Sequence, residues 1–95
     1  MLHTLFNSPG QIDLPLLKRN LREGDALLLL QDGVYAAIEG SAAFAELQTC
    51  PASFYVLEDD VQARGISGQI STSIARVSYN DFVILAVKHK NQMAW

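Results

Sequence analysis

The sequence predicts an α/β fold, a single three-layer domain over residues 1–95 with a mostly parallel sheet of about four strands flanked by helices. Short apolar segments that suit strands alternate along the chain with segments of helical spacing. One of these segments, Ala26–Leu30, is apolar at every position, which is typical of a strand buried on both faces of a parallel sheet. Apolar residues make up 49% of the chain and charged residues 18%, which excludes a disordered protein.

The first half of the chain is expected to hold two strands and two helical regions. Leu2–Phe6 is the first strand, and Ala26–Leu30 is the second. Between them, Asp13 caps a helix over 14–23, whose leucines recur at helical spacing before a terminating glycine. The second helical region follows the second strand in two pieces, Val34–Glu39 and Ala42–Gln48, and Ser41 can cap the second piece.

The second half repeats the alternation of strand and helix. Ser53–Leu57 is the clearest strand by residue type. Asp59 or Asp60 then caps a short helix that stops before a polar loop, and Ile74–Val77 forms the fourth strand. The residues from Ser78 onward have the form of a capping box, which predicts a last helix that runs to about residue 90.

The interior of this last helix, Phe82–Val87, is apolar around its whole circumference. Its β-branched residues leave a strand as the competing interpretation. If it is a helix, the sheet covers only one side of it, and a partner must cover the other, because large exposed apolar patches are uncommon on monomers. Phe82 and Leu85 are therefore candidate interface residues.

The chain ends on apolar side chains, where frayed termini are usually polar. Met93 and Trp95 are of types enriched in interface cores, which makes them candidate contacts together with His89 at the end of the last helix. The other interpretation is that this segment folds back against the chain's own core.

Two polar residues stand where parallel sheets bind ligands, beyond the carboxyl end of a buried strand. Gln31 and Asp32 follow the second strand and are candidates for holding a partner. The structural alternative is that Asp32 caps the following helix while Gly33 turns the chain.

Little in the sequence points to catalysis. Cys50 is the only cysteine, which excludes an internal disulfide and a cysteine-based zinc site. It is the only candidate nucleophile, and it lies near a predicted helix C-terminus, where the dipole does not favour a thiolate. His3 is expected to be a satisfied core histidine. No metal, nucleotide or cofactor motif is present, so no cofactor and no metal are predicted.

The charge pattern argues against a nucleic-acid binder, since the net charge is −3. Residues 1–60 carry nine acids and three bases, whereas residues 61–95 carry four bases and one acid. This asymmetry can steer partners, or it is ordinary solvated charge. No signal peptide and no membrane-spanning stretch is visible, which makes the cytoplasm the expected location.

An ordered set of short segments resembles one family over the whole length, the DsrH family of bacterial sulfur-relay subunits. The segments are 1–5, 27–34, 63–65, 68–70, Tyr79, 81–83, 87–89 and 92–95.

The resemblance implies a DsrE-like α/β subunit that assembles with TusC-like and TusD-like subunits as a dimer of heterotrimers. The complex takes persulfide sulfur from a TusA-like carrier and passes it on through a TusE-like carrier. The sulfur is used for 2-thiolation of the wobble uridine of certain transfer RNAs. The resemblance implies that the persulfide cysteine belongs to the TusD-like subunit. Direct contact between this chain and transfer RNA is not expected.

Some members of the family carry a cysteine around the first helix, and residues 14–23 here contain none. The resemblance therefore implies a non-catalytic, structural role. Two alternatives remain open. The first is that Cys50 itself carries persulfide. The second is a free-standing binding module that uses Gln31–Gly33, although Asn7 and Ser8 stand where a phospho-acceptor site needs acids.

Overall fold

The computed structural model, which describes all 95 residues, contains a five-stranded sheet with every neighbouring pair parallel. The predicted α/β class and parallel sheet are confirmed, with one strand more than expected. The order across the sheet is β4-β3-β2-β1-β5. The strands are β1 (Leu2–Leu5), β2 (Ala26–Leu29), β3 (Ser53–Leu57), β4 (Ala75–Val77) and β5 (Gln92–Ala94).

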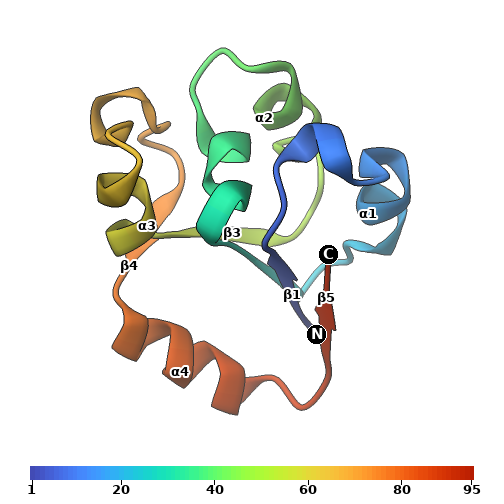
Figure 1. Ribbon diagram of the computed structural model, residues 1–95. Helices are drawn as coiled ribbons and strands as arrows, with labels where there is room; N and C mark the ends of the chain where they lie inside the picture. Colours follow the sequence, from blue (N-terminus) through green and yellow to red (C-terminus); the bar gives the residue numbers. More distant parts are fainter.

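Helices cover the two faces of the sheet unequally (Figure 1). The α-helices are α1 (Leu14–Asn20), α2 (Ala42–Leu47), α3 (Glu58–Ala63) and α4 (Tyr79–Lys88), and the 3-10 helices are η1 (Pro9–Gln11), η2 (Gln31–Ala37) and η3 (Ser67–Gln69). Side chains of α1, α2, α3 and η2 build the core on one face. Only α4 packs on the opposite face.

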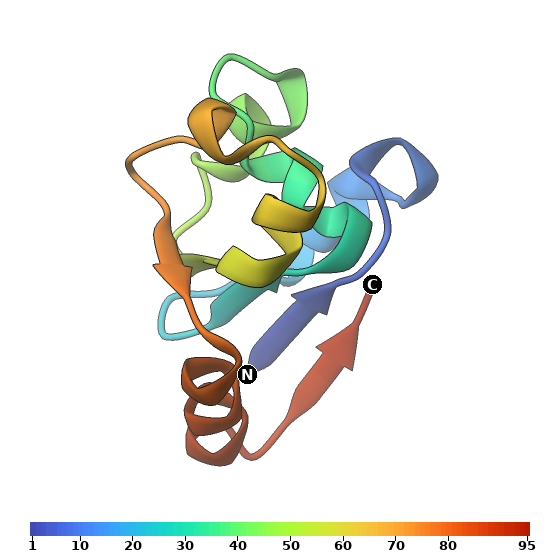
Figure 2. The same ribbon diagram turned by 60° about the vertical axis from the view of Figure 1, so that its left-hand side comes forward.

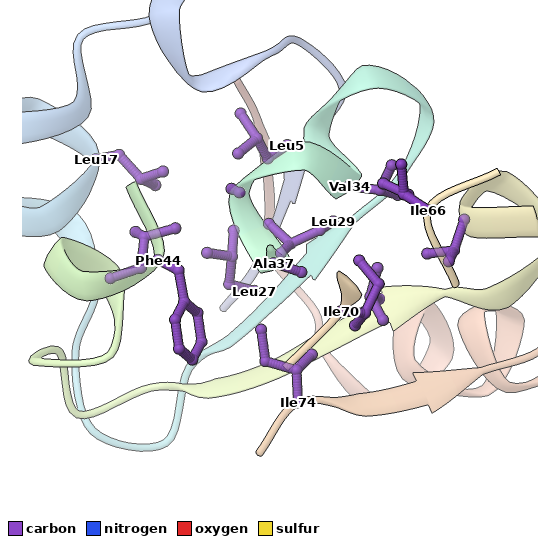
Figure 3. Close-up of a cluster of buried hydrophobic side chains, with 14 of the residues drawn as sticks. Leu5, Leu17, Leu27, Leu29, Val34, Ala37, Phe44, Ile66, Ile70 and Ile74 are labelled. Carbon is purple, nitrogen blue, oxygen red and sulfur yellow. The ribbon is translucent and has the colours of Figure 1, made fainter. Parts of the chain in front are cut away.

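Strand β2 shows why both faces of the sheet need cover. Leu27 and Leu29 point into the larger core, which Figure 3 shows. Leu28 and Leu30 face the smaller core, which α4 closes. Every residue from 26 to 30 is at most 5% exposed. The uninterrupted apolar segment is therefore a strand buried on both faces, as predicted.

The additional strand, β5, lies beside β1 at one edge of the sheet (Figure 2). Gln92, Met93 and Ala94 pair with Leu2, His3 and Thr4. This strand has three residues, all exposed, so it lacks the alternation of buried and exposed residues by which strands are recognised in a sequence. Its partner strand lies about ninety positions earlier in the chain, which no local pattern reveals.

Three predicted helix caps are confirmed. Asp13 accepts a hydrogen bond from the Leu16 amide at 3.1 Å, and Ser41 caps α2 through the Phe44 amide at 3.1 Å. Ser78 and Asp81 form the reciprocal capping box of α4. The residues from Tyr79 to Lys88 are therefore helical, and the strand interpretation of this segment is wrong.

Other predicted boundaries are wrong, each for an identifiable reason. Neither Asp59 nor Asp60 caps α3, which begins after Leu57 with no side-chain cap. Asp32 does not cap η2 either. The carboxylates of Asp60 and Asp32 are engaged elsewhere, as described below. Helix α1 ends at Asn20 rather than at residue 23, because Leu21 turns to extended backbone and is buried in the core.

The predicted α-helix over Val34–Glu39 is instead the 3-10 helix η2, which begins earlier, at Gln31. Its start is pressed against β1. A Cβ atom at Gly33 would lie 1.9 Å from the carbonyl oxygen of Leu5, so only glycine fits there. Gly33 is therefore required by the close approach of two backbone segments, whereas the sequence predicts that it turns the chain.

Candidate functional site

Gln31 and Asp32 lie at the carboxyl end of β2, where the structure ties them to α3. The Gln31 amide donates to Asp60 Oδ2 at 2.6 Å, and Gln31 has a φ of 51°, which is uncommon for a residue with a side chain. Arg64 donates from Nε and Nη2 to Asp32 Oδ1 at 3.1 and 2.9 Å. A third Arg64 nitrogen donates to the Asp60 carbonyl at 3.2 Å.

A second arginine closes the same edge of the sheet. Arg76 of β4 forms an ion pair with Glu58 at 3.3 Å and hydrogen-bonds to Ser67. The acids Asp32, Asp60 and Glu58 are thus engaged by partners within the chain. The loops at this edge are held in fixed positions, and the acids already have partners, which disfavours a separate ligand-binding module at Gln31–Gly33.

Cys50 lies at the other end of the strands, near their amino ends. It is half-buried just after α2, before the amino end of β3, and it packs against the larger core. Lys18 is a cation close enough to Cys50 for the two charges to interact, and it is bonded to Glu46. That hydrogen bond is the main reason why the pKa of Lys18 lies above its ordinary value, and Cys50 adds to the effect. Cys50 and the pair Gln31–Asp32 therefore do not form one site.

His3 is a satisfied core histidine, as predicted. It is fully buried, and both of its ring nitrogens have partners. Nε2 lies 3.1 Å from Asp25 Oδ2, and Nδ1 accepts a hydrogen bond from Trp95 Nε1 at 3.1 Å. With both nitrogens engaged, His3 has no free position from which to activate a thiol.

Four of the eight exposed large apolar side chains lie on α4. Tyr79, Val83, Ile84 and Val87 are 61%, 46%, 64% and 80% exposed, and we call these four residues the α4 apolar face. The predicted contacts Phe82 and Leu85 are half-buried against the chain's own sheet.

The four residues of the α4 apolar face were missed in the sequence because the interior of the helix is apolar on every side. The capping box contains part of the signal that could have found them. It fixes where α4 begins, and helical spacing then places Phe82, Leu85 and Ala86 on one side and Val83, Ile84 and Val87 on the other.

The C-terminal segment folds back on its own chain, which is the intramolecular interpretation. The Trp95 amide donates to the Thr4 carbonyl at 2.8 Å, and the Phe6 amide donates to the Trp95 carbonyl at 3.2 Å. The Trp95 ring also stacks on His3, with ring centroids 6.3 Å apart. Met93 stays 39% exposed.

His89 ends α4 beside the start of β1. Burial lowers the pKa of His89 below its ordinary value, and the positive charges of the Met1 ammonium and Lys88 lower it further, while Asp25 acts in the opposite direction. No three His, Cys, Asp or Glu side chains come together in a group that could ligate a metal ion. None of the helices combines the length and the apolar content that crossing a bilayer requires.

Comparison with known proteins gives a consistent picture over the full length. The model of the family described as "DsrH like protein" matches residues 7–92. The "Protein TusB" of Salmonella enteritidis is 56% identical over 95 residues, and that of Salmonella typhimurium is 55% identical, with 100% of both chains covered in each case.

Two solved structures share the fold. The solution structure of Protein Tm0979 from Thermotoga maritima has a TM-score of 0.69 and 27% identity, covering 96% of this chain and 97% of the other. The crystal structure of the ychN protein from E. coli has a TM-score of 0.75, with 99% of this chain and 97% of the other covered. At 15% identity, this second likeness shows the fold alone.

Proposed function

The chain belongs to the DsrH family, and on that premise we propose that it is a non-catalytic structural subunit of a sulfur-relay complex. In this proposal it acts in the cytoplasm as one DsrH-like domain, with TusC-like and TusD-like subunits in a dimer of heterotrimers. The complex receives persulfide sulfur from a TusA-like carrier and hands it to a TusE-like carrier for 2-thiolation of the wobble uridine of transfer RNA. The chain itself does not contact the transfer RNA or a membrane.

The observation that carries the proposal is the α4 apolar face. One ten-residue helix covers a whole face of the sheet, and its outer side leaves four large apolar residues in water. Exposed apolar patches on soluble proteins mark interaction surfaces. Lys88 ends α4 and Lys90 follows two residues later, and neither forms an ion pair within the chain. A partner with an apolar surface and an acidic rim suits it.

We propose that the other residues that the sequence singles out at this end of the chain form a contact next to the α4 apolar face, at the β5 edge of the sheet. His89 follows α4 directly, and Met93 and Trp95 lie on or beside β5, the strand that α4 leads into. We propose that Phe82 and Leu85 support the α4 apolar face from beneath, since they pack between α4 and the sheet. We propose Gln31 and Asp32 as a second, separate contact at the carboxyl end of β2.

Co-purification of this chain with its TusC-like and TusD-like partners tests the assignment. We expect the wild-type chain to be recovered in a complex, and Ile84→Asp and Val87→Asp to weaken recovery at least tenfold, because each buries a charge in the contact. The matched control is Leu16→Asp on α1, where the wild-type side chain is 40% exposed. Failure of the wild-type chain to co-purify, or an equal loss in the control, contradicts the proposal.

The non-catalytic part of the proposal rests on Cys50. It is the only thiol, it lies at the amino edge of the sheet, and Lys18, the cation beside it, is already bonded to Glu46. We expect Cys50→Ser to leave transfer RNA thiolation in cells unchanged. Loss of thiolation, together with a 32 Da persulfide adduct on the wild-type chain by mass spectrometry, would establish the alternative in which Cys50 carries sulfur.

A further inference from the structure

The strongest unassigned feature is the outer side of β5, the edge strand beyond which Figure 2 shows no further segment of the chain. Amides in and beside β1 donate to the carbonyls of Asn91 and Trp95, at 2.9 and 3.2 Å. The backbone groups of successive residues in a strand point in opposite directions, so those of Gln92 and Ala94 point away from β1. All residues of β5 are exposed. The outer side of β5 therefore presents unpaired N–H and C=O groups to which another strand can bind.

The sequence of β5 contains nothing that prevents such pairing. Proteins usually protect an exposed edge strand with a charged side chain, a proline or a bulge. Strand β5, Gln92–Ala94, has no charged residue and no proline. The opposite edge strand, β4, carries the charged Arg76 at its centre. Of the two edges of the sheet, the β5 edge is therefore the one open to an additional strand.

We propose that β5 pairs antiparallel with β5 of a second copy of this chain, about a two-fold axis through Met93, and so joins the two five-stranded sheets into one. A two-fold axis makes the two edge strands antiparallel and requires a self-complementary contact. With Met93 opposite Met93 of the second copy, Gln92 of each copy lies opposite Ala94 of the other. Each of these pairs exchanges two backbone hydrogen bonds, so the register leaves no outward backbone group of β5 unpaired.

The side chains along β5 suit this register. The Gln92 side chain donates to the Ala86 carbonyl of α4 at 3.3 Å, so Met93 lies on the other face of the sheet. Trp95 packs against the larger core on that face. Directly opposite residues of the kind that Met93 would form have Cα atoms about 4.5 Å apart, which brings the two Met93 side chains into contact. Each also reaches Trp95 of the other copy along the diagonal, and thioether–aromatic contacts are favourable.

The charges near β5 favour the antiparallel orientation. Lys88 and Lys90 both precede β5, and neither forms an ion pair within the chain. In the antiparallel pair the amino ends of the two strands lie at opposite ends of the contact, which keeps the lysines of the two copies apart. A parallel pair would bring these lysines together, and like charges opposite one another destabilise a strand pair.

This inference deepens the proposed contact at the β5 edge, and it rests on the proposed function because a dimer of heterotrimers contains two copies of this chain. The strand is short, with three residues, so few backbone hydrogen bonds hold the pair. We therefore expect the pair to be stable only within the assembled complex, where the other subunits also hold the two copies together. A test by covalent trapping belongs in cells that supply the natural partners.

Disulfide trapping in those cells tests the register. In a Cys50→Ser background, which removes the only native thiol, Met93→Cys places two cysteines opposite each other within the Cα separation that a disulfide spans. We expect the oxidant diamide to convert most of this variant into a disulfide-linked homodimer, measured by non-reducing electrophoresis. The matched control is Ala94→Cys, which is also exposed on β5. Its counterpart in the second copy lies on the diagonal, about 7–8 Å away, so its homodimer yield should be at least fivefold lower. Equal yields, or no homodimer from Met93→Cys, overturn the proposal.

A further variant tests the backbone hydrogen bonds. Proline is tolerated on an edge strand where its nitrogen faces outward, so Ala94→Pro removes an outward donor and leaves β5 docked on β1. Added to Met93→Cys, it should lower the yield of homodimer at least tenfold. Hydrogen exchange at the Leu2 amide, which donates to Asn91, shows whether β5 stays docked. An unchanged yield with β5 docked overturns the proposal, and if β5 undocks, the comparison of Met93→Cys with Ala94→Cys decides alone.

The trapping experiment separates this inference from the proposed function. A homodimer that forms at Met93→Cys while the TusC-like and TusD-like subunits fail to co-purify would reject the proposed complex and keep the pairing of β5. Co-purification without a homodimer would reject the pairing alone.

Discussion

At the scale of single residues, Gly33 is the glycine with no room for a side chain. A methyl group there would lie 1.9 Å from the carbonyl oxygen of Leu5 and 2.7 Å from its carbonyl carbon. Both of these Leu5 atoms belong to the main chain, which cannot move aside cheaply. We expect Gly33→Ala to lower the free energy of unfolding by about 3 kcal/mol, at the upper end of overpacking effects. Denaturant titration measures this, with Gly68→Ala as control, because nothing lies within 4 Å of a Cβ atom there. Equal effects would refute the argument.

The charge of Asp25 makes the free energy of unfolding depend on pH in the acid range. Burial acts to raise the pKa of Asp25, but hydrogen bonds from the Met1 ammonium, the Arg22 amide and His3 outweigh it, so the pKa lies below the ordinary value of 3.8. Because the folded-state pKa is the lower one, this stabilisation is present above pH 3.8 and is lost as the pH falls through the folded-state value.

Asp25→Asn checks this linkage by denaturant titration at a series of pH values. The variant should lose about 2 kcal/mol of unfolding free energy at pH 7, because hydrogen bonds to a charged acceptor lose their charge assistance. It should also lose part of the wild-type fall in stability at pH values below 3.8. A variant curve that runs parallel to the wild-type curve throughout this acid range would be the contrary result.

At the scale of elements, helix α4 depends on its capping box. Ser78 and Asp81 satisfy backbone amides at its first turn, at 3.2 and 3.1 Å. We expect Ser78→Ala to lower the free energy of unfolding by about 1 kcal/mol. The loss should appear as faster hydrogen exchange in α4 while β2 stays protected. A substitution of Ser73, a serine outside any helix, supplies the comparison. If this control variant lost as much α4 protection as Ser78→Ala, the capping box would not be the cause of the loss.

The elements also show how far the sequence can be interpreted. Four strands and the caps of α1, α2 and α4 follow from local patterns, because capping and strand periodicity are properties of neighbouring residues. Strand β5 does not, since Gln92–Ala94 is a strand only through its pairing with β1. The ion pair between Asp32 and Arg64 is equally non-local, and it takes the carboxylate that was expected to cap η2. Local rules therefore failed where long-range contacts decide the structure.

At the scale of the whole molecule, the unequal cover of the two sheet faces predicts how the isolated chain behaves. Five strands have several helices on one face and α4 alone on the other. We expect the native chain to bind an apolar dye such as ANS, and the double variant Ile84→Ser and Val87→Ser to bind at least threefold less at unchanged stability. Leu16→Ser is the matched control. Dye binding that is equal in all three proteins would show that the α4 apolar face is not the exposed patch.

The candidate site was only partly predictable for the same reason. An apolar last helix is visible in the sequence, and the need to cover its outer side follows from that. Which side of α4 faces outward depends on how the helix lies on the sheet, so the sequence alone points to Phe82 and Leu85 rather than to Ile84 and Val87. Trp95 stands out by type, but its bond to His3 joins residues 92 positions apart.

The pairing of β1 with β5 has a consequence for synthesis on the ribosome. Strands β1 and β2 can pair once residue 30 has emerged, whereas β5 has to wait for residue 94. At about 5–20 residues per second this interval lasts roughly 3 to 13 seconds. Throughout it, one edge of β1 presents unpaired backbone groups in a nascent chain, which is a template for mispairing. Residues 92–94 therefore close this edge of the sheet only after the other four strands have been made.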